Sequence, residues 1–169
     1  QRAATVQYML SLVNMVKELE GQELTIVPAT VGKVVPDGTP EEEWSWFVAG
    51  LQEVYALAEK SGVRMALEPL NRFETYFLNT MAQARAYADR VDHPAFRIMY
   101  DTFHAHIEEK SQASAIATVK DVFAHVHISE NDRSTPGRGN IRWCENFDAL
   151  RQVGYNGWMM VEAFGLALP

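Results

Sequence analysis

Four short apolar segments of the sequence carry, at or near their ends, side chains that commonly bind divalent metals. Glu68 follows "VRMAL", Asp101 follows "RIMY", His127 lies within "AHVHIS", and Glu162 follows "WMMV". Three carboxylates and one imidazole brought close together would strongly resist ionisation unless a cation neutralised them. A set of oxygen ligands with one histidine suits Mn2+, Mg2+ or Co2+ better than a structural zinc site. We therefore expect these four residues to share one divalent metal ion.

The apolar segments that carry these residues are typical of buried β-strands. Strands are expected over residues 62–68, 96–101, 122–129 and 157–164, and a fifth run over residues 24–29 is typical of a strand buried on both faces of a parallel sheet. Side chains alternate along a strand, so each metal-binding group should continue an inward row formed by Ala66, Met99, His125 and Met160. Reactive groups of α/β sheets and barrels collect at the carboxyl ends of the strands, where the four groups would meet.

Helical patterns separate these strands. Helices are expected over residues 6–21, 39–60, 80–90, 111–119 and 143–154. Thr39 before Pro40 is a typical helix start, and Thr80 begins a capping box. Gly21 and Gly154 are the expected C-terminal caps. The alternation of helix and strand predicts parallel strands joined by right-handed crossovers.

The predicted fold class is α/β, as a single domain over residues 1–169. Five strands fit either an open doubly wound sheet or part of a (β/α)8 TIM barrel, which normally takes ~250 residues. No G-x-G-x-x-G follows any strand, which disfavours a dinucleotide-binding fold. Five strands cannot close an eight-stranded barrel, so we expect the sequence to be a fragment of a longer polypeptide, or other segments to complete the barrel.

Composition narrows the class of function. With 47% apolar and 22% charged residues, the chain has the composition of a soluble globular domain. Its net charge of -7, with no run rich in Lys or Arg, argues against a nucleic-acid partner. No apolar run reaches the roughly 18 residues of a membrane span. The single Cys144 excludes an internal disulfide framework, indicates a reducing compartment, and is expected to be a small apolar residue near a helix start.

Further polar residues lie close to the predicted metal site in the sequence. His104 comes three residues after the second acid, close enough to enter the same strand mouth, and Arg133 follows the strand that carries His127 and could reach a substrate oxygen. His125 fits the inward row, but it fits a hydrogen-bonded core histidine equally well. Glu108 and Glu109 predict a solvated, acidic helix start.

Four motifs make the chain resemble a known family. "LEPLNRFE", "YDTFHAHIEE", "HVHISENDRSTPGRG" and "GYNGWMMVEAF" together resemble the xylose-isomerase-like (β/α)8 sugar isomerases and epimerases, and within them the D-tagatose (D-psicose) 3-epimerase-like group. The motifs occur in family order with matching separations. The resemblance implies that the chain holds the part of such a barrel from its third helix to its eighth strand, without the first three strands and the last helix.

The resemblance also implies roles for individual residues. The metal ligands would be Glu68, Asp101, His127 and Glu162, with Mn2+ as the expected ion and Mg2+, Co2+ or Zn2+ as alternatives. The catalytic acid and base would be Glu68 and Glu162. The residues that contact the substrate would be Glu74, His104 and Arg133. The "EPL" after the first acid differs from the apolar pair more usual in ketose epimerases, and this difference leaves the choice of sugar open.

The activity implied is epimerisation at C3 of a ketose through a cis-enediolate. In this reaction His104 and Arg133 would stabilise charge on the C2 oxygen, and Glu74 would bind a terminal hydroxyl. The alternatives are an aldose–ketose or hydroxypyruvate-type isomerase on the same metal, an inosose dehydratase, a phosphodiester-cleaving endonuclease that shares the barrel, and a non-catalytic sugar-binding module. The expected partners are a small sugar and further copies of the chain, in the cytoplasm, with no nucleic acid and no membrane.

Overall fold

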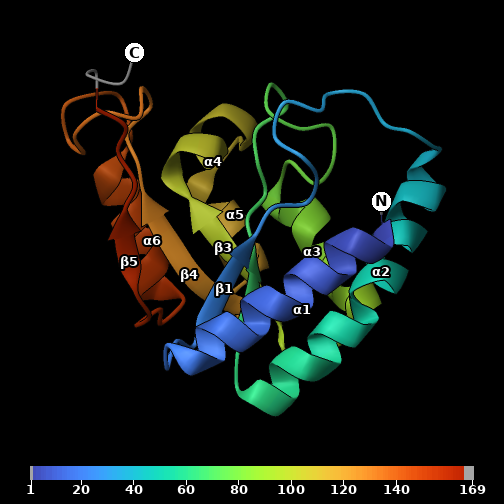
Figure 1. Ribbon diagram of the computed structural model, residues 1–169. Coiled ribbons are helices and arrows are strands. Elements are labelled where there is room, and N and C mark those ends of the chain that lie inside the picture. Colours follow the sequence, from blue (N-terminus) through green and yellow to red (C-terminus); the bar gives the residue numbers. More distant parts are fainter. Residues whose placement is uncertain (1, 166–169) are drawn as a thin grey trace.

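The computed structural model describes residues 2–165, which form one parallel β-sheet with helices packed on one of its faces (Figure 1). The strands are β1 (Glu23–Ile26), β2 (Arg64–Leu67), β3 (Phe96–Asp101), β4 (Phe123–Ile128) and β5 (Met159–Val161). The helices are α1 (Arg2–Glu18), α2 (Pro40–Ser61), α3 (Met81–Val91), α4 (Thr102–Glu108), α5 (Gln112–Thr118) and α6 (Trp143–Gln152).

Each strand pairs with the next strand of the sequence, in the order β1-β2-β3-β4-β5, and every pair is parallel. A doubly wound sheet reverses its strand order at a switch point, whereas a (β/α)8 barrel keeps the strands in sequence order. The predicted fold class is therefore confirmed as part of a TIM barrel. Among residues 2–165, β1 and β5 are the two edges of the sheet.

The two faces of the sheet bury different side chains. Leu67, Ile98 and Val126 point to the helices and belong to the large apolar core that the helices share. Ala66 and Met99 point the other way, into a small separate group. This alternation confirms the inward rows predicted for β2 and β3, whose next members toward the carboxyl ends are the predicted metal ligands Glu68 and Asp101.

Helix starts follow the predicted capping signals, but one helix end differs. Thr39 and Thr80 both form capping boxes with the third residue of their helices. The first helix ends at Glu18, and the left-handed residue after it is Glu20, with φ 57°, and not Gly21. A Cβ on Gly21 would lie 2.9 Å from Val16 Cγ1, so this glycine is needed for close packing and not for a positive φ.

Two further expectations about helical segments have clear outcomes. Cys144 lies near the start of α6, as expected, but its side chain is exposed and is not a packed apolar residue. Among the helices of residues 2–165, none combines the length and the apolar composition that crossing a bilayer requires.

The edge strands are shorter and more exposed than predicted. The first strand was expected to be buried on both faces over residues 24–29, yet β1 ends at Ile26 and Thr25 is exposed. All three residues of β5 are exposed. An apolar run indicates that a strand can be buried, but burial also needs a paired strand along each of its edges. A strand at the edge of a sheet has such a partner on one side only.

Helix α4 was not predicted. It begins directly after β3, and Asp101 caps it by accepting a hydrogen bond from the main-chain nitrogen of Phe103 at 2.6 Å. Glu108 and Glu109 therefore lie at the carboxyl end of a helix, so the expected acidic helix start is wrong. The Glu108 side chain is only 1% exposed, so it is not solvated either. Because Asp101 ends a strand and caps a helix at once, no connecting segment marks the boundary in the sequence.

Candidate metal centre and active site

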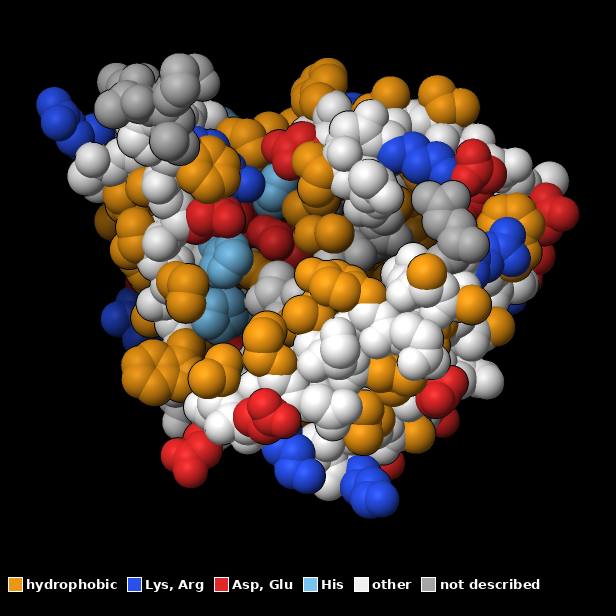
Figure 2. Space-filling view, in the orientation of Figure 1, with side chains coloured by type: hydrophobic (Ala, Val, Ile, Leu, Met, Phe, Trp, Pro, Cys, Tyr) orange, Lys and Arg blue, Asp and Glu red, His pale blue; other side chains and the backbone are white. Residues whose placement is uncertain are grey.

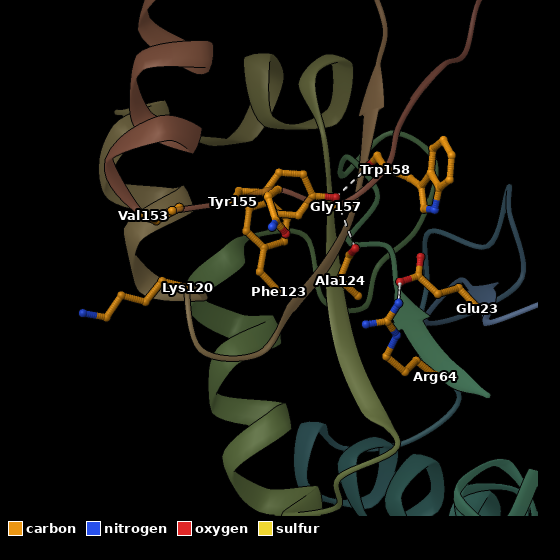
Figure 3. A pocket seen from close by; sticks show the side chains of 11 residues that line it. Glu23, Arg64, Lys120, Phe123, Ala124, Val153, Tyr155, Gly157 and Trp158 are labelled. Atoms are coloured by element: carbon orange, nitrogen blue, oxygen red, sulfur yellow. Dashed lines mark hydrogen bonds and ion pairs between the residues drawn. The ribbon is translucent and has the colours of Figure 1, made fainter. Parts of the chain in front are cut away.

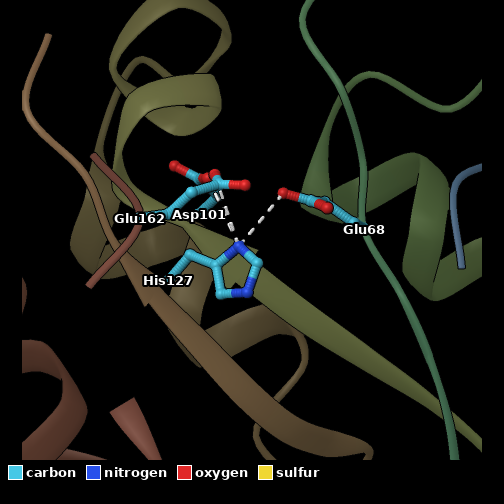
Figure 4. A group of neighbouring side chains, drawn as sticks. All are labelled: Glu68, Asp101, His127 and Glu162. Carbon is cyan, nitrogen blue, oxygen red and sulfur yellow. Dashed lines mark ion pairs between the residues drawn. The ribbon is translucent and has the colours of Figure 1, made fainter. Parts of the chain in front are cut away.

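The structure brings the four predicted metal ligands together at the carboxyl ends of β2, β3, β4 and β5. One ligand atom from each of Glu68, Asp101, His127 and Glu162 lies within 4.8 Å of the others. Figure 4 shows His127 Nδ1 facing all three carboxylates, with Glu68 on one side and Asp101 and Glu162 on the other. Parallel strands direct their carboxyl ends to the same edge of the sheet, which is why residues so far apart in sequence meet.

The space between these groups fits a divalent cation. His127 Nδ1 lies 3.5 Å from Glu68 Oε1, 3.5 Å from Glu162 Oε2 and 3.7 Å from Asp101 Oδ2. This buried nitrogen has no hydrogen-bond partner among the described residues. Bonds of about 2.0–2.2 Å from one central ion place its ligand atoms roughly 3–4.4 Å apart. The kinds of donor atom and their spacing therefore both fit one metal ion held by all four residues.

The electrostatics of the cluster favour a bound cation. Burial by itself would lower the pKa of His127, but the three carboxylates outweigh it and raise this pKa to about 11. Burial would likewise raise the pKa of Asp101, but His127 and Arg133 hold it well below its usual range. A metal ion bound to His127 Nδ1 takes the place of the proton there, so metal binding releases a proton from the ring.

Arg133 lies at the mouth of the site, as its place after β4 predicted. Its Nη1 atom donates to Asp101 Oδ2 at 2.9 Å and also pairs with Glu162 Oε2. The guanidinium carbon lies 4.1 Å from the centre of the Phe103 ring and 5.1 Å from that of Phe164, so two aromatic faces flank the charge. Arg133 thus neutralises part of the acidic cluster, but it does not fill the space beside His127 Nδ1.

His104 projects from α4 into the same mouth. Its Nε2 atom lies 3.7 Å from Glu68 Oε1 and 2.9 Å from Arg133 Nη2. Its Nδ1 atom accepts a hydrogen bond from the main-chain nitrogen of Asn71 at 3.0 Å. Burial holds the pKa of His104 below its usual value. A neutral imidazole is therefore placed between the acidic cluster and the loop that follows β2.

Glu74 reaches the site through Asn71. The Asn71 side chain donates to Glu74 Oε1 at 2.8 Å and lies 2.9 Å from His104 Nδ1. Asn71 thus joins two of the predicted substrate contacts. No local pattern predicts this, because the contact links a loop to a helix residue 33 positions later.

Arg72 fastens the same loop to α4. Its main-chain nitrogen donates to Glu108 Oε1 at 2.7 Å, and its guanidinium donates to both oxygens of that carboxylate. The Glu108 side chain is 1% exposed, whereas that of Arg72 is 65% exposed. This pair holds the loop that carries Asn71 and Glu74 against the helix that carries His104.

Glu130 organises the loop after β4 and was not singled out in the sequence. It is fully buried, and its carboxylate accepts hydrogen bonds from the main-chain nitrogens of Gly137 and Ile141, both at 2.8 Å, and from Trp143 Nε1 at 3.1 Å. A buried carboxylate is stable only when it is paired or hydrogen-bonded in this way. The loop it holds carries Arg133. The sequence signal for Glu130 is its spacing, three residues after His127 and three residues before Arg133.

The site opens into a hollow on one face of the molecule. Figure 2 shows acidic and histidine side chains gathered along this hollow, with hydrophobic side chains around it. Phe73 and Phe164, which follow β2 and β5, are 73% and 53% exposed. Apolar surface around a small group of convergent polar side chains is the usual form of a small-molecule site.

A second hollow lies at the amino ends of the strands (Figure 3). Its lining includes an ion pair between Arg64 and Glu23 at 2.6 Å, and the Tyr155 hydroxyl, which donates to the carbonyl oxygen of Trp158 at 2.7 Å. His125 Nδ1 lies 3.1 Å from Glu23 Oε2. His125 is therefore a buried histidine that lies beside Glu23 and outside the acidic cluster, but its Nδ1 atom has no hydrogen-bond partner among the described residues, so the hydrogen bond expected of a core histidine is absent at this atom.

Sequence comparison decides the family. A sequence model of the xylose isomerase-like TIM barrel matches residues 1–167. The chain belongs to the xylose isomerase-like TIM barrel family. The resemblance inferred from the four motifs is thereby confirmed, and so is the barrel that it implied.

Relatives of this family member include ketose epimerases. It is 43% identical over 122 residues to D-psicose 3-epimerase of Ruminiclostridium cellulolyticum, covering 72% of this chain and 42% of that protein. It is 32% identical over 162 residues to L-ribulose 3-epimerase of Mesorhizobium japonicum, covering 96% of this chain and 54% of that protein. The crystal structure of D-psicose 3-epimerase with D-tagatose from Clostridium cellulolyticum H10 superposes with a TM-score of 0.90 at 33% identity, covering 96% of this chain and 57% of that one.

This member of the family spans about half the length of the curated relatives it matches. Epimerases that act on ketoses are isomerases, so the named relatives all fall in one class of enzyme.

Proposed function

We propose that this protein takes part in a divalent-metal-dependent ketose 3-epimerase reaction, in which the C3 centre of a ketose is inverted through a cis-enediolate. The observation that carries the proposal is the position of Glu68 and Glu162 on opposite sides of His127 Nδ1 (Figure 4). The names of the ketose epimerases to which the chain is similar support the class of reaction.

The metal would be held by Glu68, Asp101, His127 and Glu162. A bound divalent ion supplies positive charge that stabilises the enediolate formed when the C3 proton leaves. Manganese is the proposed ion, because three carboxylates with one imidazole suit Mn2+.

Two glutamates carry out the proton transfers. Glu162 removes the C3 proton on one face of the substrate, and Glu68 returns a proton on the other face, which inverts the centre. The roles exchange when the opposite epimer is the substrate. Two carboxylates are needed because a single base can return the proton only to the face from which it took it.

Three further residues hold the substrate. His104 Nε2 and Arg133 Nη2 lie 2.9 Å apart at the mouth, and we assign them to the C2 oxygen, where negative charge develops during deprotonation. Glu74 accepts a hydrogen bond from a terminal hydroxyl. Asn71 already holds this carboxylate in place through the bond to Oε1.

The test is exchange of the C3 proton with deuterated solvent. A panel of ketoses is incubated with Mn2+-loaded protein, the metal is removed with a chelator, and the sugars are examined by NMR. Exchange at C3 is expected with at least one ketose. Glu162→Gln should abolish it, because an amide cannot accept the proton.

The matched control is Glu53→Gln on the exposed side of α2, which should exchange at the unchanged rate. Metal content is measured on each variant, so that loss of the ion is distinguished from loss of the base. Undiminished exchange in Glu162→Gln would contradict the assigned role. Exchange at C1 in place of C3 would indicate an aldose–ketose isomerase.

We also propose that residues 1–169 belong to one barrel domain, that the protein forms homo-oligomers, and that it works in the cytoplasm. The single cysteine, Cys144, is exposed and would stay reduced in that compartment.

A further inference from the structure

Asn71 is almost completely buried, at 1% exposed, yet its side chain is fully hydrogen-bonded. Its Oδ1 atom accepts from the main-chain nitrogen of Phe73 at 3.0 Å, and its Nδ2 atom donates to Glu74 Oε1 at 2.8 Å. A main-chain N–H can only donate and an ionised carboxylate can only accept, so these partners fix which end of the amide is nitrogen. Asn71 therefore presents two donors to its third neighbour, His104.

Both donors point at one atom. His104 Nδ1 lies 3.0 Å from the main-chain nitrogen of Asn71 and 2.9 Å from its Nδ2 atom. A main-chain N–H cannot reverse its polarity, so His104 Nδ1 accepts and carries no proton, and the proton of the ring is on Nε2. We propose that Asn71 is a positioning residue that locks His104 in the Nε2–H tautomer and directs that N–H into the active site.

The locked tautomer leaves the contact with Arg133 without an acceptor. With a proton on His104 Nε2, this atom and Arg133 Nη2 are both donors, although they lie only 2.9 Å apart. The imidazole is held by the main chain, and the guanidinium is held through Nη1 by Asp101 and Glu162, so the two donors converge on one point. An acceptor oxygen placed at this point would receive both hydrogen bonds. That the acceptor is the C2 oxygen of a ketose rests on the proposed function, but the tautomer does not.

The tautomer can be read directly in the protein. Histidine-15N-labelled protein is examined by two-bond 1H–15N NMR, first without added metal and then with diamagnetic Mg2+, and the signals of His104 are assigned by their loss in His104→Gln. We expect an unprotonated Nδ1 and a protonated Nε2. A protonated Nδ1 in the wild-type protein would overturn the proposal before any variant of Asn71 is made.

A matched pair of variants tests the part played by Asn71. Asn71→Asp replaces the side-chain donor by an oxygen that faces His104 Nδ1 and leaves only the main-chain N–H to hold this atom unprotonated, so we expect the share of the Nε2–H tautomer to fall. Asn79→Asp is the control, because Asn79 Nδ2 donates to two carbonyl oxygens of the same loop, at 2.7 and 3.0 Å, and to neither His104 nor Glu74. Asn79→Asp should lose these loop hydrogen bonds and leave the tautomer of His104 unchanged. An unchanged tautomer in Asn71→Asp, or the same change in both variants, would overturn the proposal.

Activity provides a separate measurement. Where a ketose exchanges its C3 proton, Asn71→Asp is expected to lower kcat about 10- to 100-fold, as is usual when a group that orients a site residue is removed. Near-UV circular dichroism shows whether each variant is folded. If Asn71→Asp does not fold, the NMR spectrum of the wild-type protein decides the tautomer. If the wild-type protein has the Nε2–H tautomer but exchanges no ketose proton, the proposed function fails while the role of Asn71 stands.

Discussion

His127 Nδ1 faces three carboxylates at 3.5–3.7 Å and hydrogen-bonds to none of the described residues. A buried polar atom without a hydrogen bond needs some other partner. The carboxylate oxygens around this nitrogen are suited to a cation. Arg133 supplies positive charge to Asp101 and Glu162, but it leaves the nitrogen without a partner. The single-residue evidence thus favours metal binding over a simple network of ion pairs.

Because an ion that binds only the folded state stabilises it, we expect added Mn2+ to raise the thermal unfolding temperature and a chelator to lower it. At 100 times its dissociation constant the ion contributes about 2.7 kcal/mol. Calorimetry of His127→Gln and Asp101→Asn should show no such shift. Glu74 lies outside the cluster, so Glu74→Gln should keep the shift in unfolding temperature. An equal shift in all three variants would show that the metal binds elsewhere.

At the scale of elements, the loop between β2 and α3 is fastened to the short helix α4. Glu108 accepts hydrogen bonds from three nitrogen atoms of Arg72, namely the main-chain nitrogen, Nε and Nη2. Glu109 accepts one from the main-chain nitrogen of Met81 at 2.7 Å. Helix α4 has seven residues, too few to be stable alone, and depends on such contacts. The loop and the helix therefore support each other, and together they place His104.

The pair of Arg72 and Glu108 should make stability depend on pH. Burial by itself would raise the pKa of Glu108, but Arg72 outweighs it and holds this pKa below the ordinary value of 4.5. A carboxyl with a lowered folded-state pKa contributes stability that is fully present above the unfolded value and is lost as pH falls through the folded value. Arg72→Ala should therefore lower the urea midpoint most near neutral pH, and the difference from wild type should shrink below pH 4.5.

The control for this experiment is Arg151→Ala, whose partner Asp148 is 55% exposed. Exposed ion pairs contribute little, so its urea midpoint should stay close to that of the wild type at every pH. A difference between Arg72→Ala and wild type that does not change with pH would show that Arg72 acts through packing and not through its charge.

At the scale of the whole molecule, the sheet has two edges with apolar side chains beside them. Val27 beyond β1 is 40% exposed, and Val161 in β5 is 61% exposed. A cavity of about 850 Å³ lies between α1, β1 and α2. Exposed edges offer unpaired main-chain groups to any other strand, and closed barrels avoid this by pairing every strand.

We expect residues 1–169, purified by themselves, to self-associate as their concentration rises, which light scattering after size-exclusion chromatography would measure. Replacing Val27 and Val161 together with Lys should reduce the association, because charge on an edge opposes strand pairing. Leu19→Lys is the control, since this residue is 74% exposed but lies in the segment between α1 and β1 and in neither edge strand. A monomer at every concentration would contradict the expectation.

Most helices and strands, and the four residues of the acidic cluster, could be predicted from the sequence. Capping residues such as Thr39 and Thr80 mark helix starts locally, and apolar runs mark strands, so both could be read without knowing the fold. The acidic cluster could be predicted for a further reason: once strands are parallel, residues at their carboxyl ends must meet at one edge. Helix α4 escaped prediction, because Asp101 serves the strand, the helix cap and the cluster at once.

The contacts around the cluster could not be predicted from the sequence. The hydrogen bond from Asn71 to His104 and the pair of Arg72 with Glu108 join groups 33 and 36 residues apart, and neither end has a local pattern that names its partner. The exposure of β1 and β5 likewise depends on neighbours that an apolar run cannot specify. Strand order follows from rules that act along the chain, whereas the choice of hydrogen-bond partner follows from which loops the finished sheet brings together.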